Sequence, residues 1–275
     1  MMMMSFESNA CTPPEPSTPR RSAETLDHVI ERLDEIAERS VQEETRFGYF
    51  AALYRRVTAA VRHEVRTGFF LDGPRMERFD VAFANRYFDA LDRYRAHPGD
   101  PGVARSWRVA FDACARPELT ILQHLYLGLD AHLILDLGVA AAETCPGAKI
   151  HDLRRDFLKI NDIVASLMRE VDRDVGRASR WVGAFDSVAG GAWAAANNVA
   201  LRSAREIAWS AALKLARLDP ADRGPVIERL DALAAYLAAQ IAEPNVGVRL
   251  LVREVREREV DQPANITRVL QGRKA

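Results

Sequence analysis

The most apolar part of the sequence lies between Ile121 and Ala142 and reads ILQHLYLGLDAHLILDLGVAAA. It is long enough to cross a bilayer, but four ionisable side chains interrupt it: His124, Asp130, His132 and Asp136. Because such groups are costly at bilayer depth, we expect a buried helix of a soluble protein here, and no membrane span. We call this expected helix the central helix, because it lies near the middle of the sequence.

The segments on either side of this helix also carry the helical period. Apolar residues recur at spacings of three and four, and no run alternates as a half-buried strand does. Clusters of proline and glycine separate the segments, and no repeat of fixed period divides them. The sequence therefore predicts one compact all-α domain of eight or nine helices. The expected helices cover about residues 25–39, 42–66, 75–96, 106–115, 118–143, 152–177, 194–217, 223–242 and 246–259, with an irregular patch at 181–193.

The two ends of the chain differ in composition from this helical body. Residues 1–22 are rich in Pro, Ser and Thr, which predicts a disordered leader. They lack the basic and apolar regions of a signal peptide. Residues 23–260 form the predicted helical domain, and the polar residues 261–275 are predicted to be a loose tail.

The overall composition excludes several classes of protein. The chain has 275 residues, of which 48% are hydrophobic and 28% are charged, so it is not disordered as a whole. Its 38 Lys and Arg nearly balance 39 Asp and Glu, which argues against a protein that grips nucleic acid or an anionic membrane. Three cysteines without a CxxC pair fit a reducing compartment, and we expect a cytoplasmic protein.

Polar residues form a stripe along the central helix. His124, Gly128, His132 and Asp136 recur every four residues. His132 and Asp136 lie one turn apart and can share a hydrogen bond or a ligand. His124 lies about 12 Å further along the axis, too far to bind the same metal. A glycine inside a helix costs about 1 kcal/mol relative to alanine, so Gly128 indicates close approach of a neighbouring backbone or a ligand.

Two interpretations of the His132 and Asp136 pair stay open. In the first, Asp136 orients His132 and raises its basicity, which leaves one ring nitrogen for proton transfer or for a metal. In the second, the two side chains satisfy each other and neighbouring helices as a buried structural tie.

Other helices contribute further candidates. Asn161 and Asp156 could face His132 or His124 if the helix at 152–177 packs antiparallel against the central helix, although Asp156 could instead pair with Arg or Lys. A semi-buried Arg86 would need a carboxylate partner or an anionic ligand. The candidate residues are His132, Asp136, His124 and Asn161 for catalysis, Asn85, Arg86, Gln123 and Trp107 for substrate binding, and His132, Asp136 and Asp156 for a metal.

Five segments of the chain form a distinctive set: RMERFDVAFANRYFDAL (75–91), SWRVAF (106–111), LQHLYLGLDAHLILDLGVAAAET (122–144), DFLKIND (156–162) and AREIAW (204–209). Together they resemble an actinobacterial family known as the domain of unknown function 5995, over about residues 46–259. The resemblance names no reaction, and the range of the family suggests natural-product tailoring as a setting.

The His132-xxx-Asp136 string is also similar to the HxxxD pair of zinc ligands in zinc-dependent phospholipase C and the P1-type nucleases. The further histidines and the HxxxE motif of those enzymes are missing downstream. A trinuclear zinc site is therefore not expected, and the cofactor stays open as a divalent metal or none.

The sequence thus predicts an intracellular all-helical enzyme that acts on a small, largely apolar molecule by His/Asp acid-base or metal-assisted chemistry. The alternative is a non-catalytic protein that binds a ligand or a partner helix, with a structural polar stripe. We expect a small-molecule partner, and neither nucleic acid nor membrane. Phe69 and Phe70, in the predicted loop 68–74, could cover a pocket or seal a homodimer.

Overall fold

The computed structural model describes residues 22–178, 192–259 and 262–272. These residues contain helices and no strand, which confirms the predicted all-α fold. The elements are α1 (Leu26–Gln42), α2 (Phe47–Arg66), α3 (Gly73–Ala96), α4 (Arg105–Ala113), α5 (Ile121–Asp130), the π-helical segment η1 (Ala131–Asp136), α6 (Leu137–Thr144), the 3-10 turn η2 (Gly147–Lys149), α7 (Ile150–Ala178), α9 (Ala192–Ala216), the 3-10 turn η3 (Pro220–Asp222), α10 (Gly224–Ala242), α11 (Val246–Arg256) and α12 (Pro263–Leu270).

Two sequence predictions fall on the parts outside these ranges. The expected disordered leader, residues 1–22, lies outside the described residues except for Ser22. The expected irregular patch at 181–193 lies outside them up to residue 191, and α9 begins at Ala192.

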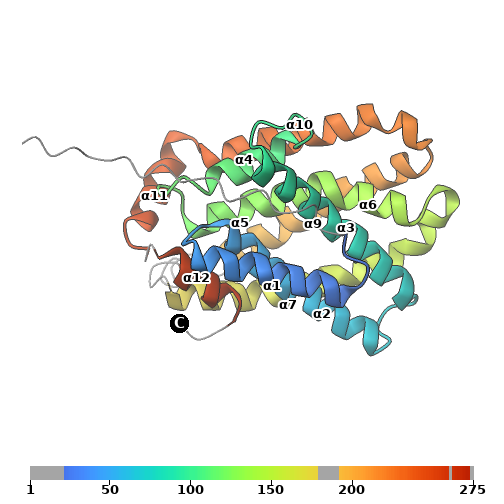
Figure 1. Ribbon diagram of the computed structural model, residues 1–275, viewed down its shortest axis with the longest axis horizontal. Coiled ribbons are helices and arrows are strands. Elements are labelled where there is room, and N and C mark those ends of the chain that lie inside the picture. The colour runs from blue at the N-terminus through green and yellow to red at the C-terminus, as the bar shows by residue number, and fades with distance from the viewer. Residues whose placement is uncertain (1–21, 179–191, 260–261, 273–275) are drawn as a thin grey trace, which may run out of the picture.

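The continuous helix formed by α5, η1 and α6 runs through the interior. Its α5 end packs on α2, α4 and α10, and its α6 end packs on α3 and α9. Figure 1 shows α10 along one side of the molecule, α2 and α7 along the opposite side, and this central helix between them. All six residues of η1 are buried.

This central helix is also the described segment that is long and apolar enough to cross a membrane, over Ile121–Thr144. Of its most apolar stretch of 18 residues, 83% is buried inside the fold. A helix that is apolar on all sides needs such an environment, and here the other helices supply it.

Two glycines let neighbouring helices approach the central helix closely. A Cβ on Gly128 would lie 2.6 Å from a ring carbon of Phe50 on α2. A Cβ on Gly138 would lie 2.6 Å from the carbonyl oxygen of Ala208 on α9. The expected close approach at Gly128 therefore exists, but the neighbour is a side-chain ring and not a backbone or a ligand.

The π-helical segment is a feature that the sequence did not predict. The backbone N–H of Leu137 donates to the carbonyl of His132, five residues back, where an α-helix would use a four-residue step. Apolar residues surround this turn on all sides, so their spacing does not distinguish one π turn from a continuous α-helix. Single π turns inside α-helices are frequent at functional sites.

The C-terminal region differs from the expected loose tail of residues 261–275. Residues Pro263–Leu270 form α12, which packs on α1, α2 and α7. Ile266, Thr267 and Leu270 are buried, because their spacing of one and three places them on the same edge of this short helix. Three such residues are too few to stand out in a polar segment.

Candidate functional site

A cavity of about 50 Å³ lies between α2, α3, α7, α9 and the central helix. Aliphatic and aromatic side chains make up its wall, apart from four residues with polar groups: Tyr54, Asp80, His132 and Arg205. The volume is enough for about four water-sized groups.

His132 is buried in the wall of this cavity, with 2% of its surface exposed. Its Nδ1 lies 3.2 Å from Oδ2 of Asp136. The imidazole stacks on the ring of Phe83 with centroids 3.5 Å apart, and the ring of Tyr54 meets it at an edge, 4.7 Å away. Among the described residues, Nε2 of His132 has no hydrogen-bond partner. One ring nitrogen is therefore held and the other is free.

Asp136 is held in place by three donors. Besides His132, the indole Nε1 of Trp107 donates to Oδ2 at 2.8 Å, and Nε of Arg86 donates to Oδ1 at 3.0 Å. Arg86 also lies 3.7 Å from a carboxylate oxygen of Glu143. The predicted carboxylate partner of Arg86 is thus present. Trp107 and Arg86, predicted as substrate-binding residues, both position Asp136.

The surroundings of His132 favour the neutral imidazole. Burial lowers the pKa of His132 below its ordinary value of 6.5, and the hydrogen bond and charge of Asp136 act in the opposite direction without reversing this shift. Because a carboxylate only accepts hydrogen bonds, Nδ1 carries the ring proton. Nε2 then has a lone pair, which makes it a base at neutral pH.

Asp80 is a second buried titratable group of the cavity that the sequence analysis missed. Only 4% of it is exposed, and among the described residues its Oδ2 has no hydrogen-bond partner. Burial raises the pKa of Asp80 to about 7. The spacing of Met76, Asp80, Phe83 and Tyr87 places this carboxyl on the apolar face of α3, and that position was the signal available in the sequence.

Asn161 is not among the residues that line the cavity, and its amide bonds to Arg205, which is. Oδ1 of Asn161 accepts a hydrogen bond from Nε of Arg205, and the carbonyl of Phe157 accepts another from Nη2 at 2.7 Å. Burial lowers the pKa of Arg205 to about 10. No hydrogen bond joins Asn161 to His132 in the described structure.

His124 does not lie on the cavity that contains His132. It lines a separate space of about 20 Å³ between α2, α4 and α5, together with Cys114 and Arg46. Its ring meets the ring of Tyr49 edge to face, with centroids 5.7 Å apart. The two histidines of the predicted stripe therefore face different surroundings.

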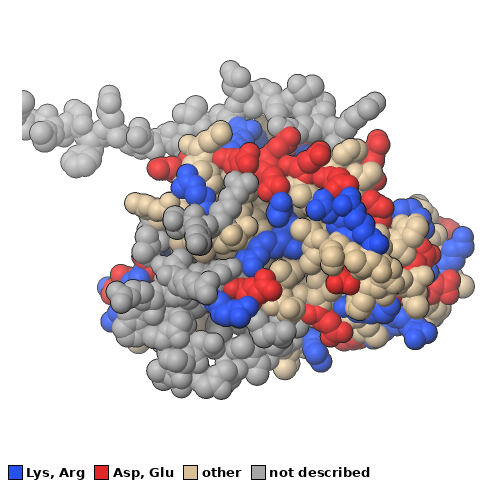
Figure 2. Space-filling model, turned by 90° about the horizontal axis from the view of Figure 1, so that it is seen from below, with Lys and Arg blue, Asp and Glu red and all other residues tan. Residues whose placement is uncertain are grey.

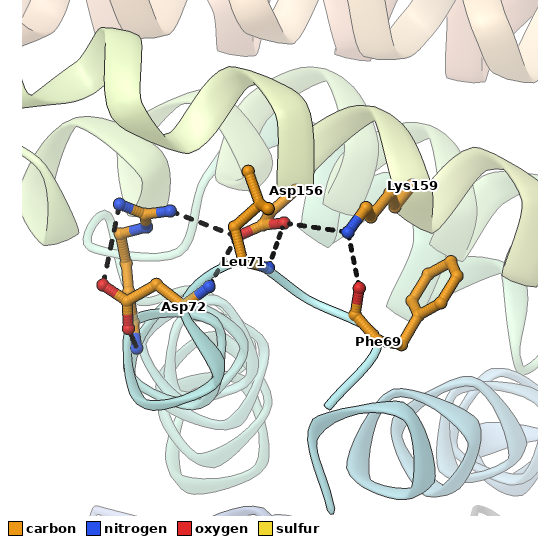
Figure 3. Close-up of polar contacts among 6 residues, drawn as sticks. Phe69, Leu71, Asp72, Asp156 and Lys159 are labelled. Carbon is orange, nitrogen blue, oxygen red and sulfur yellow. Dashed lines mark hydrogen bonds and ion pairs between the residues drawn. The ribbon is translucent and has the colours of Figure 1, made fainter. Parts of the chain in front are cut away.

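Asp156 anchors the loop between α2 and α3 (Figure 3). Its fully buried carboxylate accepts from the backbone N–H of Leu71 at 2.8 Å and of Asp72 at 3.1 Å, and from Arg75 at 3.1 Å. Burial alone would raise the pKa of Asp156, but these three donors together with the charge of Lys159 outweigh it and hold the pKa below its ordinary value. Lys159 lies 3.6 Å from the same carboxylate.

The two phenylalanines of this loop have different positions. Phe70 is buried in the core, whereas Phe69 is 40% exposed. The ammonium of Lys159 donates a hydrogen bond to the backbone carbonyl of Phe69 (Figure 3). The same ammonium lies over the ring of Phe69.

Two predicted substrate-binding residues bond to backbone groups instead. The amide of Asn85 donates to the carbonyl of Ala23 at 2.9 Å and accepts from its N–H at 2.8 Å. The side chain of Gln123 closes the N-terminal cap of α5 with Thr120 and donates to the carbonyl of Ile241 at 2.7 Å. The amide of Asn85 thus joins α3 to the segment before α1, and the amide of Gln123 joins α5 to α10.

The residues predicted to bind a metal do not gather into one group. Within residues 22–178, 192–259 and 262–272, no three His, Cys, Asp or Glu side chains are arranged to hold a metal ion. His132 and Asp136 lie together, and Asp156 is occupied at the loop between α2 and α3.

Comparison with known proteins assigns the chain to a protein family. Residues 26–244 match the family described as "Family of unknown function (DUF5995)". The chain belongs to this family. The family inferred from the sequence is thereby confirmed, over residues 26–244 where about 46–259 was expected. The match includes every polar residue of the cavity in this DUF5995 chain. No curated protein and no solved structure matches the chain.

Proposed function

We propose that this chain is an enzyme that moves a proton to or from a small, largely apolar molecule, with His132 as the acid-base group. The observation that supports this is that the two ring nitrogens of His132, a residue that lines an apolar cavity, differ: Nδ1 is held by Asp136, and Nε2 has no described hydrogen-bond partner. A buried polar atom without a hydrogen-bond partner costs free energy, so binding of a ligand that donates a hydrogen bond to Nε2 is favoured.

The chemistry of such a site follows from the hydrogen bonds around Asp136. A neutral His132 accepts a proton at Nε2, and the adjacent carboxylate stabilises the imidazolium that forms. Trp107 and Arg86 act as positioning residues, because they fix the two carboxylate oxygens of Asp136. The ring of Phe83 fixes the plane of the imidazole.

A second candidate is a non-catalytic ligand-binding protein that uses the same cavity. The three protein donors on Asp136 favour it, because a carboxylate saturated in this way can serve as a structural tie. The two candidates differ in whether a bound molecule exchanges a proton with His132.

We further propose that the enzyme works inside the cell, with natural-product tailoring in an actinobacterium as its setting. Cysteine usage supports the first statement, and the family resemblance supports the second. A homodimer is a further proposal, for which the exposed Phe69 is one available contact residue.

The acid-base proposal is tested with acetone, whose four heavy atoms suit the small cavity. Deuterium incorporation into acetone in D2O at neutral pH is followed by proton NMR, for the wild type and for His132→Gln. A positioned general base accelerates proton transfer about 100-fold or more, so the wild type should exceed the variant by that factor. His124→Gln is the control, because His124 lies outside the cavity, and it should exchange like the wild type.

Equal exchange rates in the wild type and His132→Gln would contradict the proposal. Acetone that shifts the NMR signals of cavity side chains but exchanges no faster than in buffer would favour the non-catalytic candidate. Circular dichroism of each variant checks that the helices are intact.

A further inference from the structure

Asp80 is isolated among the charged and titratable groups that line its cavity. Tyr54 on α2, His132 on η1 and Arg205 on α9 line the same space, and none of them forms a hydrogen bond or ion pair with Asp80. The described partners of Arg205 are the carbonyl of Phe157 and the amide of Asn161. Burial alone accounts for the raised pKa of Asp80, so no described positive charge compensates the negative charge of its carboxylate.

A buried carboxylate without a partner is unstable as an ion. It either keeps a proton or pairs with a cation that enters the site. The position of Asp80 at the cavity allows the second solution, because a ligand bound there is adjacent to its carboxyl group.

Aromatic rings line the same cavity as Asp80. Phe79 and Phe83 lie on α3 beside Asp80, with their rings stacked 6.2 Å apart, and the ring of Tyr54 meets Phe83 at 5.9 Å. Aromatic faces attract cations, and a carboxylate with several rings is a common arrangement for binding organic ammonium groups.

We infer that the ligand of this cavity carries a protonated amine on a short apolar body, and that Asp80 is its counter-ion. This inference rests on the proposed function and names the substrate class of the same site. A primary amine with a pKa near 10, like that of lysine, is protonated at neutral pH. The neutral His132 adds no positive charge that would repel such a ligand.

The experiment compares three small probes of similar length: n-propylamine, 1-propanol and propionate. Their dissociation constants at pH 8 are measured by NMR titration of the full chain. If Asp80 is the counter-ion, propylamine binds about tenfold or more tightly than propanol, and Asp80→Asn removes this preference. Propanol binding should change little in Asp80→Asn. Asp162→Asn, at an exposed position, is the matched control and should behave like the wild type.

The pH dependence of propylamine binding adds a second readout. Because burial places the pKa of Asp80 near 7, the carboxyl is mostly ionised at pH 8 and mostly protonated at pH 6. Propylamine should therefore bind about tenfold more weakly at pH 6 than at pH 8. The pKa values of Tyr54 and Arg205 lie above this range, and His132→Gln should keep the same dependence, which assigns it to Asp80.

The outcomes separate this inference from the proposed function. Equal affinity for propylamine and propanol, or an unchanged propylamine affinity in Asp80→Asn, overturns the amine ligand and leaves the acetone test of His132 standing. Tight propylamine binding that requires Asp80, with no acetone exchange above the His132→Gln level, supports the amine ligand and overturns the proton transfer.

Discussion

The two ring nitrogens of His132 meet different surroundings, and this difference is the basis of the functional proposal. Nδ1 is committed to Asp136, whereas Nε2 has no described hydrogen-bond partner, and the residue lines an apolar cavity. Asp136 in turn connects the local structure, because its carboxylate accepts hydrogen bonds from three side chains on three different elements. Structural and chemical roles are thus divided between the two residues.

This division predicts that substitutions of Asp136 and His132 lower the free energy of unfolding by different amounts. Asp136→Ala leaves the buried indole N–H of Trp107 and the guanidinium of Arg86 without their acceptor, and should lower the free energy of unfolding by about 3 kcal/mol. His132→Gln keeps a polar group of similar size and should cost about 1 kcal/mol. Urea denaturation of both variants measures these values. Equal losses would instead identify the pair as a single structural tie.

The sequence predicted this pair but not all of its partners. The spacing of one turn between His132 and Asp136 was enough, because both residues lie on one helix. The convergence of Arg86 and Trp107 on Asp136 depends on how α3 and α4 pack, which spacing along one helix does not encode. Asp80 was missed because a lone acid on an apolar face forms no motif with other residues.

At the level of single elements, the central helix combines a π turn with two close approaches. The π turn spans Ala131–Asp136 and contains both members of the His132 and Asp136 pair. Gly138 follows it directly in α6, where the backbone of α9 comes within contact distance. The boundaries of this helix were predictable from its apolar residues, but its hydrogen-bond pattern was not, because the residues of an α turn and a π turn are the same.

A methyl group at Gly138 tests how closely α6 and α9 must pack. Gly138→Ala would place its Cβ 2.6 Å from the carbonyl oxygen of Ala208, so the helices must separate. We expect a loss of about 2 kcal/mol in the free energy of unfolding. Gly224→Ala is the matched control, since its Cβ would meet nothing within 4 Å, and it should be neutral or slightly stabilising. The same loss in both variants would contradict this packing.

At the level of the whole molecule, composition predicted the fold class and the charge balance. Acidic and basic side chains are interspersed over the face shown in Figure 2, as the near-zero net charge suggests. The C-terminal end was harder to predict, because α12 has only eight residues and lies between polar flanking residues. The family match ends at residue 244, yet α12 packs on α1, α2 and α7 within the matched region.

The contribution of α12 is measurable by truncation. A chain that ends at Glu259 loses Ile266 and Leu270, whose side chains are almost completely buried. Burial of two such side chains contributes about 4 kcal/mol, so the midpoint of urea unfolding should fall markedly. A chain that ends at Gly272 keeps α12 and should unfold like the full chain. Similar midpoints for all three chains would show that α12 adds no stability.

The protonation state of His132 at pH 7 tests the central claim most directly. Nitrogen-15 NMR of the imidazole rings, assigned by comparison with His132→Gln, reports the charge and the tautomer of this residue. We predict a neutral ring at pH 7 with its proton on Nδ1 and a pKa below 6.5, because burial disfavours the charged form. A doubly protonated ring at pH 7, or a neutral ring with its proton on Nε2, would contradict the claim that Nε2 of His132 is a free base.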